Sequence, residues 1–475
     1  MGASEFAPDE AARGGTGTTK RVWALAWPAI LTNLLQSAVG FVGGTIVSRE
    51  LGTAAIAATG VGGRIFFVQQ VLLMAVTTGT MALVARAWGA GNRVEAERVT
   101  RTSLWLCSAL AILLAVPCAV FARELVSLAS LWGLDGPTTE LGAAYVRWVS
   151  LSTLPFGISL TIATALRAAG DTRTPLLISI AGAALTLFAL WVLVMEGFGV
   201  RSMGVAGAAA AIGLGAGVSA LASLGLWRSD KLVVGSRPGG NDFDAGRMRR
   251  LMRVGAPAGA EGFSFQIGFV VFIGIIARYG NEANAAYQLG VNVLAFSFLV
   301  GQAFSIAAST LVGQHLGARD EPGAERSGWR AMALAIGVMV VFGAGIIGFA
   351  EPVARFMSRD PEVIRLTVIF IWVLGSVQAL MAIEFTLGGA LRGAGDTIFP
   401  FVTVLSGLTF GRLAFAALFM SLGKGIEWIY AALIADYVIK GVLFVSRFRS
   451  GRWKGMLTER DEALVLGDAP ETEAG

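Results

Sequence analysis

An eleven-residue segment occurs twice in this chain. It reads ALRAAGDTRTP at 165–175 and ALRGAGDTIFP at 390–400, so eight of the eleven positions match at an offset of 225. Other pairs keep nearly the same offset: Leu83 and Val84 return as Leu311 and Val312, and Pro28 returns as Pro257. The chain therefore consists of two tandem copies of one unit. In membrane proteins, parallel repeats related by an axis along the membrane normal are typical of transporters whose two lobes rock around a central site.

Composition places both copies in a membrane. Hydrophobic residues make up 55% of the 475 residues, charged residues only 15%, and the mean hydropathy is +0.69. A spanning helix needs about 20 mainly apolar residues. Each half contains six such stretches: 24–47, 55–85, 103–121, 141–165, 174–196 and 203–227, then 254–277, 285–314, 329–350, 364–390, 399–420 and 426–447.

We therefore predict an all-α membrane protein with twelve transmembrane helices, built as two parallel-repeat six-helix lobes around a central cavity. The alternative is a large outer-membrane barrel, which would show alternation in segments of about ten residues instead of long apolar runs. The predicted parts are a disordered cytoplasmic tail, an N-lobe, a cytoplasmic linker, a C-lobe and a second cytoplasmic tail, at 1–23, 24–227, 228–253, 254–448 and 449–475.

The Lys and Arg residues are concentrated in the segments predicted to lie inside the membrane-bounded compartment. A net charge of +5 would suggest nucleic acid in a soluble chain, but here 25 Lys and Arg fall in the segments predicted inside, 8 in the outside loops and four within spans. This asymmetry fits the positive-inside rule and predicts a multi-pass protein of the plasma (inner) membrane with both termini in the cytoplasm. No nucleic-acid partner is expected. The basic residues of the linker are expected to form a solvated loop that faces the headgroups of membrane lipids.

The repeated segment has a plain physical interpretation as a corner. In the first copy, Gly170 permits a tight turn after a helix, Asp171 can cap the next helix, and Pro175 is tolerated in its first turn. Arg167 lies near a helix end, where a cation meets the negative end of the helix dipole. The second copy repeats these parts at Arg392, Gly395, Asp396 and Pro400.

Acidic residues inside apolar helices are costly and indicate function. Glu261 follows Pro257 by one turn, and Glu384 lies midway through the tenth predicted span. Burial and nearby charges can shift the protonation of such groups, so Glu261 and Glu384 are the predicted ion-coupling residues, for H⁺ or for Na⁺ bound at these two carboxylates. Asp436 and Lys440 are four residues apart on one helix face, and we interpret them as a structural ion pair.

Neutral polar residues complete the predicted site. In the second half they can form an ion or substrate shell, or can instead bond one another between helices: Gln266, Tyr287, Gln288, Asn292, Gln302 and Gln378. In the first half, Asn33 and Gln36 are candidates for substrate binding. No carboxylate precedes Glu50 in the first predicted helix, so an ion-coupling acid is not expected there.

These features resemble the multidrug and toxic compound extrusion family. The matching residues are the two Leu-Arg-Xaa-Ala-Gly-Asp-Thr motifs at 166–172 and 391–397, the two early prolines, the segment 311–314 with Gly317-Ala318, and the segment 285–288. The resemblance spans about 24–447. It implies a six-plus-six fold with a central cavity, and export of organic compounds in exchange for inward sodium ions or protons.

Family members carry acidic residues in their seventh and tenth helices, and Glu261 and Glu384 fall in these helices, about one turn from the positions of the best-known members. Another branch uses an aspartate late in the first helix, where this sequence has Gly44. The resemblance therefore implies coupling in the second half of this chain.

The leading hypothesis is a secondary antiporter that exports amphipathic, often cationic organic compounds by alternating access, with membrane lipids around it, no cofactor, and a monomeric state. The alternative is a lipid-linked precursor flippase of the same superfamily, which should have several basic residues in its cavity. The chain holds a single histidine and no phosphate-binding Gly-Xaa4-Gly-Lys-Ser/Thr loop, so neither an intramembrane metalloenzyme nor an ATP-driven pump is expected. A receptor or scaffold would not need intramembrane carboxylates.

Overall fold

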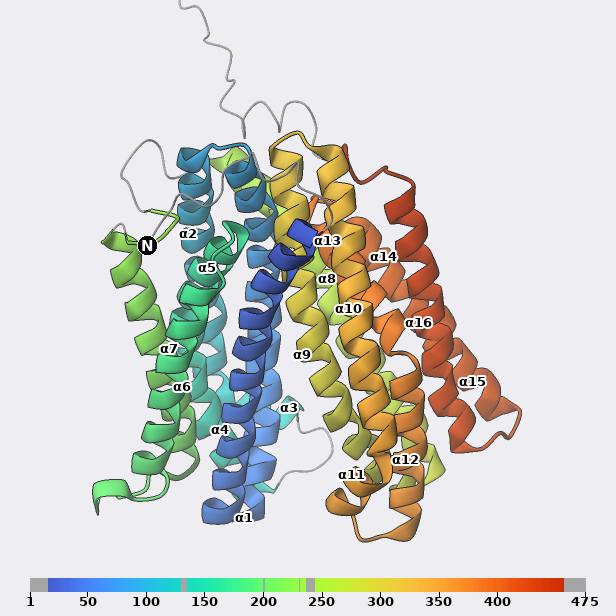
Figure 1. Ribbon diagram of the computed structural model, residues 1–475. Helices are drawn as coiled ribbons and strands as arrows, with labels where there is room; N and C mark the ends of the chain where they lie inside the picture. The colour runs from blue at the N-terminus through green and yellow to red at the C-terminus, as the bar shows by residue number, and fades with distance from the viewer. Residues whose placement is uncertain (1–15, 130–134, 200, 230, 236–243, 457–475) are drawn as a thin grey trace, which may run out of the picture. The chain divides into compact units, whose positions relative to one another are not determined.

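The structure is a computed structural model that describes residues 16–129, 135–199, 201–229, 231–235 and 244–456 (Figure 1). Every regular element in these ranges is helical. They form two compact units. The N-unit consists of residues 31–84 and 92–255, and the C-unit takes the rest of the described chain, including residues 85–91 and the start of the first helix up to Ile30.

The first helix is too long for one membrane span. α1 covers Thr16–Gly89, or 74 residues, which is roughly 110 Å of helix against about 30 Å of hydrocarbon. Gly52 breaks it with a φ of 80° and a ψ of −173°. Only glycine adopts this backbone without strain, so α1 is two spans, as the sequence predicts.

The remaining helices of the N-unit follow in order. Their bounds are α2 Arg93–Val120, α3 Ala122–Ala129, α4 Gly136–Leu151, α5 Thr153–Ala168, α6 Arg173–Leu193, the short η2 Gly197–Gly199, and α7 Gly204–Arg228. The axes of α4 and α5 differ by 40° at Ser152, and the two together make one bent span. Helix α7 packs on α4, α5 and α6.

The C-unit repeats this order. Its helices are α8 Ala245–Ile276, whose start up to Gly255 belongs to the N-unit, then η3 Ala277–Tyr279, α9 Asn281–Gly317, α10 Glu321–Gly348, α11 Ala350–Met357, α12 Pro361–Ser376, α13 Gln378–Gly393, α14 Ile398–Ser406, η4 Gly407–Leu413, α15 Ala414–Ser421 and α16 Ile426–Arg449. Here α12 and α13 form the bent span, at 50°. Figure 1 colours α9 to α16 from yellow to red. Helix α9 packs on α10, α12 and α13, and α16 packs on α13 and η4.

In the described ranges, nine helices are long and apolar enough to cross a membrane, or eleven when each bent pair counts as one span. The break at Gly52 makes α1 a double span and gives the twelve that the sequence predicts. Two short helices, α3 and α11, were not among the predicted elements. Each follows the third span of its repeat.

The predicted tails are partly ordered where they adjoin the lobes. Residues 1–15 and 457–475 lie outside the described residues, but α1 already begins at Thr16, and Val22 is buried in the C-unit's core. After α16, Trp453 is fully buried and stacks on Phe448. These apolar contacts explain why α1 begins before the first predicted span and why the chain remains packed after the last one.

Buried basic residues change the interpretation of the linker. Helix α8 begins at Ala245, so the end of the predicted linker is helical. Arg247 donates two hydrogen bonds to Glu95, at 3.0 and 3.2 Å, and both side chains are buried in the N-unit. Arg250 is also buried. The expectation of a fully solvated basic loop is therefore wrong for these arginines, because a buried carboxylate and apolar packing hold this stretch against the N-unit.

Candidate functional site

Four charged side chains meet inside the C-unit. Arg412 Nη2 lies 2.5 Å from Asp436 Oδ2, and Lys440 Nζ lies 3.1 Å from Asp436 Oδ1 and 3.2 Å from Glu384 Oε1. We call Glu384, Arg412, Asp436 and Lys440 the charge cluster. Its formal charges sum to zero. Arg412 pairs with Asp436.

Three elements bring the cluster together. Asp436 and Lys440 are neighbours on one face of α16, Glu384 comes from α13, and Arg412 comes from η4, a π-helical turn of seven residues. Such turns occur frequently at functional sites. Two glycines allow η4 to approach α16 closely: a Cβ at Gly407 would lie 2.6 Å from Asp436 Oδ1, and one at Gly411 would lie 2.5 Å from Asp436 Cα. A larger residue at either position would push the two helices apart.

Aromatic rings surround the basic half of the cluster. The Arg412 guanidinium lies 5.7 Å from the ring centroid of Phe272 and 5.9 Å from that of Tyr437, and Lys440 Nζ lies 5.2 Å from Tyr437. Tyr287, a predicted site residue, packs edge-on against Phe272 with centroids 5.7 Å apart. Ring faces attract cations and exclude water, so this half of the cluster is dry.

Access to the cluster is from the Glu384 side. The side chains of Asp436 and Lys440 are 0% and 1% exposed and that of Arg412 is 3% exposed, whereas Glu384 retains 14%. Among the described residues, Glu384 Oε2 has no hydrogen-bond partner, and this oxygen atom is itself buried. The chemistry open to this arrangement is therefore the arrival and departure of a small cation or a proton at Glu384.

The second predicted coupling residue, Glu261, forms a separate pair. Arg392 Nη1 donates to both carboxylate oxygens of Glu261, at 2.9 and 3.1 Å, and Nη2 lies 3.5 Å from Ser305 Oγ. Arg392 belongs to the second copy of the repeated motif. Its place near a helix end predicted only an interaction with the helix dipole, and the contact with a residue 131 positions earlier was not predicted. Glu261 and Arg392 are 17% and 18% exposed.

The two motif copies differ at their aspartates. Asp171 Oδ1 accepts hydrogen bonds from the backbone N–H groups of Arg173 and Thr174 and so caps α6, as predicted. Asp396 instead accepts from Arg447 Nε at 2.8 Å, and Thr397, the N-cap residue of α14, makes no side-chain cap hydrogen bond. The capping prediction is wrong for Asp396, because α16 supplies a cation that competes for its carboxylate. Gly170 and Gly395 both have the expected positive φ, 95° and 88°.

The neutral polar residues fall into three groups. Gln378 is buried at the start of α13, where its Nε2 donates to Ser297 Oγ at 2.8 Å, and this contact ties the bent span to α9. Tyr287 packs with the aromatic rings around the basic half of the charge cluster. The side chains that do not join the cluster are the half-buried Asn33 and Gln266 and the exposed Gln36, Gln288, Asn292 and Gln302.

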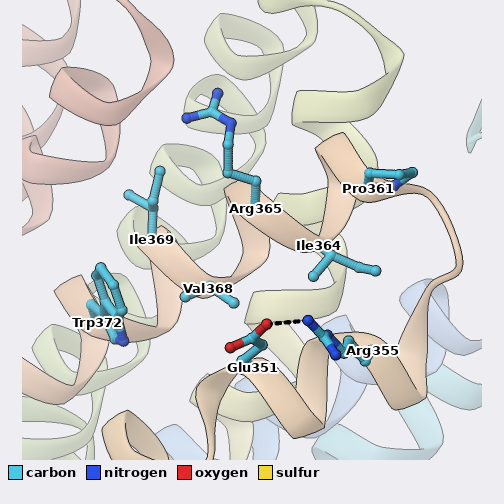
Figure 2. A pocket seen from close by; sticks show the side chains of 8 residues that line it. All are labelled: Glu351, Arg355, Pro361, Ile364, Arg365, Val368, Ile369 and Trp372. Atoms are coloured by element: carbon cyan, nitrogen blue, oxygen red, sulfur yellow. Dashed lines mark hydrogen bonds and ion pairs between the residues drawn. The ribbon is translucent and has the colours of Figure 1, made fainter.

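A surface pocket of about 620 Å³ lies elsewhere on the C-unit, between α11 and α12 (Figure 2). It is lined by Glu351, Arg355, Pro361, Ile364, Arg365, Val368, Ile369 and Trp372. Glu351 pairs with Arg355 across one end, and more than half of each of these two side chains is exposed. None of the predicted site residues lines this pocket, so it is not the candidate site.

The model of the MatE family matches this chain over residues 28–193 and 257–418, one stretch in each repeat. The chain belongs to the MatE family. The expected membership of the multidrug and toxic compound extrusion family is thereby confirmed.

Relatives and solved structures agree with this membership. The MatE chain is 30% identical over 456 residues to a probable multidrug resistance protein NorM of Thermotoga maritima, covering 94% of this chain and 96% of that protein. Its fold matches a mutant of the Vibrio cholerae MATE transporter VcmN with a TM-score of 0.85 at 18% identity, over 92% and 99% of the two chains. A MOP superfamily transporter from Pyrococcus furiosus gives a TM-score of 0.82 at 20% identity, over 96% and 98%. The predicted all-α, twelve-span membrane fold is confirmed.

Proposed function

We propose that this MatE protein is a secondary active antiporter that exports amphipathic, often cationic organic compounds in exchange for inward H⁺ or Na⁺ by alternating access. The observation that carries the proposal is the charge cluster. Buried ionised groups are costly in a membrane protein and mark ion pathways and proton relays. The NorM relative, described as a probable multidrug resistance protein, supports the substrate class.

The geometry suits an exchange reaction. Glu384 is the exposed end of an otherwise dry cluster, so a coupling cation that binds there changes the charge balance of groups held by α13, α16 and η4. Adding one positive charge to a neutral dry cluster disfavours a cationic substrate nearby. Coupling ion and substrate then exclude each other, which is what antiport requires. Glu261 with Arg392 provides a second, more accessible carboxylate in the same unit.

The proposal includes a location and an assembly state. The excess of basic residues in the predicted inner segments supports a plasma (inner) membrane protein with both termini in the cytoplasm. We propose that it acts as a monomer and needs no cofactor. The flippase alternative is less well supported, because the two basic residues of the cluster, Arg412 and Lys440, are neutralised by acids and do not offer a free cationic surface to a pyrophosphate.

Purified protein in liposomes tests this function. Export of a cationic dye is measured under an imposed pH gradient and, separately, under an imposed sodium gradient, for the wild type and for Glu384→Gln. Glu282→Gln is the matched control, because Glu282 is an exposed acid at the start of α9. We expect gradient-driven export by the wild type and by the control, and loss of export in Glu384→Gln. Export that needs no ion gradient, or full activity of Glu384→Gln, would contradict the proposal.

A further inference from the structure

We infer that Lys440 occupies the position of a bound sodium ion between Glu384 and Asp436, and that this makes the MatE protein a proton-coupled rather than a sodium-coupled exporter. The inference rests on the proposed antiport function and specifies its coupling ion. Lys440 is then the residue that determines ion specificity, acting through the carboxylate of Glu384.

The position of the ammonium group carries this inference. Nζ of Lys440 lies between two carboxylates on different helices, 3.2 Å from Glu384 Oε1 and 3.1 Å from Asp436 Oδ1. A sodium ion bridging the same two oxygens would need the space that Nζ fills. The side chain is 1% exposed and its neighbour Tyr437 packs against it, so Lys440 has no room to swing aside.

Both carboxylates of the cluster already have basic partners. The charged groups that face Glu384 are Lys440 and Asp436 from α16 and Arg412 from η4. Two carboxylates already meet two fixed cations. A sodium ion would have to share these carboxylates with both cations and find further oxygen ligands in a dry site, whereas a proton needs only one oxygen; either one would add a positive charge, which is unfavourable at low dielectric.

The other acids inside the C-unit give sodium no better place. Glu261 is held by Arg392 at 2.9 Å, and Asp396, at the motif corner, is held by Arg447 at 2.8 Å. In the described helices of this unit, the acids away from helix ends are Glu261, Glu384 and Asp436, and each has a basic side chain within ion-pair distance.

A proton can act where sodium cannot. It binds to a carboxylate oxygen without needing a coordination shell, and Glu384, the least buried member of the cluster, has one oxygen, Oε2, that accepts no hydrogen bond from the described residues. Protonation removes the negative charge on α13 that pairs with Lys440, while the ion pair between Lys440 and Asp436 within α16 remains. The contact between α13 and α16 then loosens, and the cluster carries one positive charge until the proton leaves.

The decisive experiment removes the internal cation. Lys440→Met leaves Glu384 without a partner and gives the cluster one negative charge, which a sodium ion can balance. We expect sodium chloride to raise the Tm of detergent-solubilised Lys440→Met by about 2–4 °C over choline chloride, and to leave the wild type unchanged. Lys440→Arg keeps the cation and should behave as the wild type does. Lys424→Met is the matched control, because Lys424 is an exposed lysine of the same unit.

Transport gives the second readout. In liposomes, the wild type should export dye under a pH gradient without sodium and should show no export under a sodium gradient at clamped pH. Export driven by sodium alone in the wild type would overturn the inference while leaving antiport intact. If neither gradient drives export, the proposed function fails, and the sodium-dependent Tm still decides whether Lys440 replaces sodium.

A double variant with a neutral cluster is the control for misfolding of Lys440→Met. Glu384→Gln combined with Lys440→Met leaves only the Arg412–Asp436 pair, so this double variant should fold and show no sodium response. A Lys440→Met protein that stays folded but does not respond to sodium would overturn the inference. The same conclusion follows if Lys440→Met accumulates only when Glu384→Gln is added, whatever the sodium concentration, because sodium then fails to replace the ammonium group.

Discussion

The same helix crossing is built in opposite ways in the two repeats of this MatE protein. At the offset of 225, Gly182 corresponds to Gly407 and Gly215 corresponds to Lys440. In the N-unit, α6 and α7 approach so closely that a Cβ on Gly215 would overlap the Thr186 hydroxyl. In the C-unit, the corresponding elements η4 and α16 enclose a buried lysine, an aspartate and an arginine.

This difference shows which features the fold itself requires. The N-unit has Leu187, Ala211 and Ser159 where the C-unit has Arg412, Asp436 and Glu384, so this helix crossing packs without a charged residue at these three positions. Buried ion pairs are often no more stabilising than apolar residues of similar volume. Because the charge cluster is not needed for the crossing, its retention in one repeat points to a function there.

The bent spans of the two repeats share a feature. Both repeats have a hydrogen bond between a side-chain amide and a hydroxyl at the bend, but the positions of the amide and the hydroxyl are exchanged. In the N-unit, Thr153 at the start of α5 donates to Gln69 Oε1 at 2.5 Å. In the C-unit, Gln378 at the start of α13 donates to Ser297 Oγ at 2.8 Å. Position 69 corresponds to 297 at the offset of 228 that Leu83 and Leu311 share, and position 153 corresponds to 378 at the offset of 225. The amide and the hydroxyl have therefore changed places while the bond between the two helices remains.

The largest expected effect of a single substitution is at Asp436. Asp436→Asn leaves Arg412 and Lys440 buried with no full negative charge between them, and breaking a buried pair in this way costs about 3–5 kcal/mol. The Tm of the purified protein should fall strongly. A Tm equal to that of the wild type would show that the cluster is more hydrated or less charged than its geometry indicates.

Replacing the whole cluster separates stability from function. Glu384→Gln, Arg412→Met, Asp436→Leu and Lys440→Met together remove all four charges at similar volume. Such replacements are often neutral or stabilising by about 1–4 kcal/mol, so the protein should fold as the wild type does, as the uncharged N-unit crossing suggests. We expect it to lose ion-driven export. Normal export by this variant would assign the cluster a purely structural role.

The next effect is at Glu261. Glu261→Gln should strongly impair export while leaving membrane insertion intact, because it removes a titratable group but keeps its volume. The stability cost should be smaller than at Asp436, about 1–3 kcal/mol, since Arg392 remains partly exposed and can reach solvent. Dye export and the Tm of one preparation measure both. Wild-type export rates in this variant would make the Glu261–Arg392 pair a structural contact of the motif.

The sequence predicts what depends on local pattern. Apolar runs, the duplicated motif and the prolines give the twelve spans, and the positive φ at Gly170 and Gly395 follows from the glycines themselves. The spacing of Asp436 and Lys440 predicts their pair. Contacts between residues far apart in the chain could not be predicted from local pattern. Arg392 contacts Glu261 across 131 residues, and Arg247 contacts Glu95 across 152. Position in the chain gave no signal that these partners meet.

Local pattern also left the placement of two kinds of residue open. Neutral polar side chains on α9 looked equivalent in the sequence, yet Tyr287 is buried beside Phe272 while Gln288 and Asn292 are exposed. The periodicity of an almost wholly apolar helix does not say which face meets another helix. Arg412 joined Asp436 through a π turn, and π turns have no reliable sequence signature.

A moderate effect is expected at the two bends. Gln378→Leu leaves the Ser297 hydroxyl without its amide partner, and Thr153→Val leaves the Gln69 carbonyl oxygen without its hydroxyl donor. Each loss should cost about 1–3 kcal/mol, and the two shifts in Tm should be similar. Markedly unequal shifts would show that the exchange of amide and hydroxyl between the repeats changed the strength of the bend, and not only its composition.

The smallest expected effect is in the N-unit, and it tests whether the two repeats divide the work of transport. Asn33 and Gln36 on α1 are neutral, and their side chains do not titrate near physiological pH. They can contact substrate, but a proton cannot be carried by them. Asn33→Ala and Gln36→Ala should therefore change the apparent substrate affinity and leave the ion-to-substrate ratio unchanged. The ratio is measured in liposomes from dye and ion fluxes recorded together, with Glu384→Gln as the variant that should abolish coupling. An altered ratio in either alanine variant would mean that the N-unit takes part in coupling without a carboxylate of its own, and that the difference between the repeats is not a division between ion and substrate.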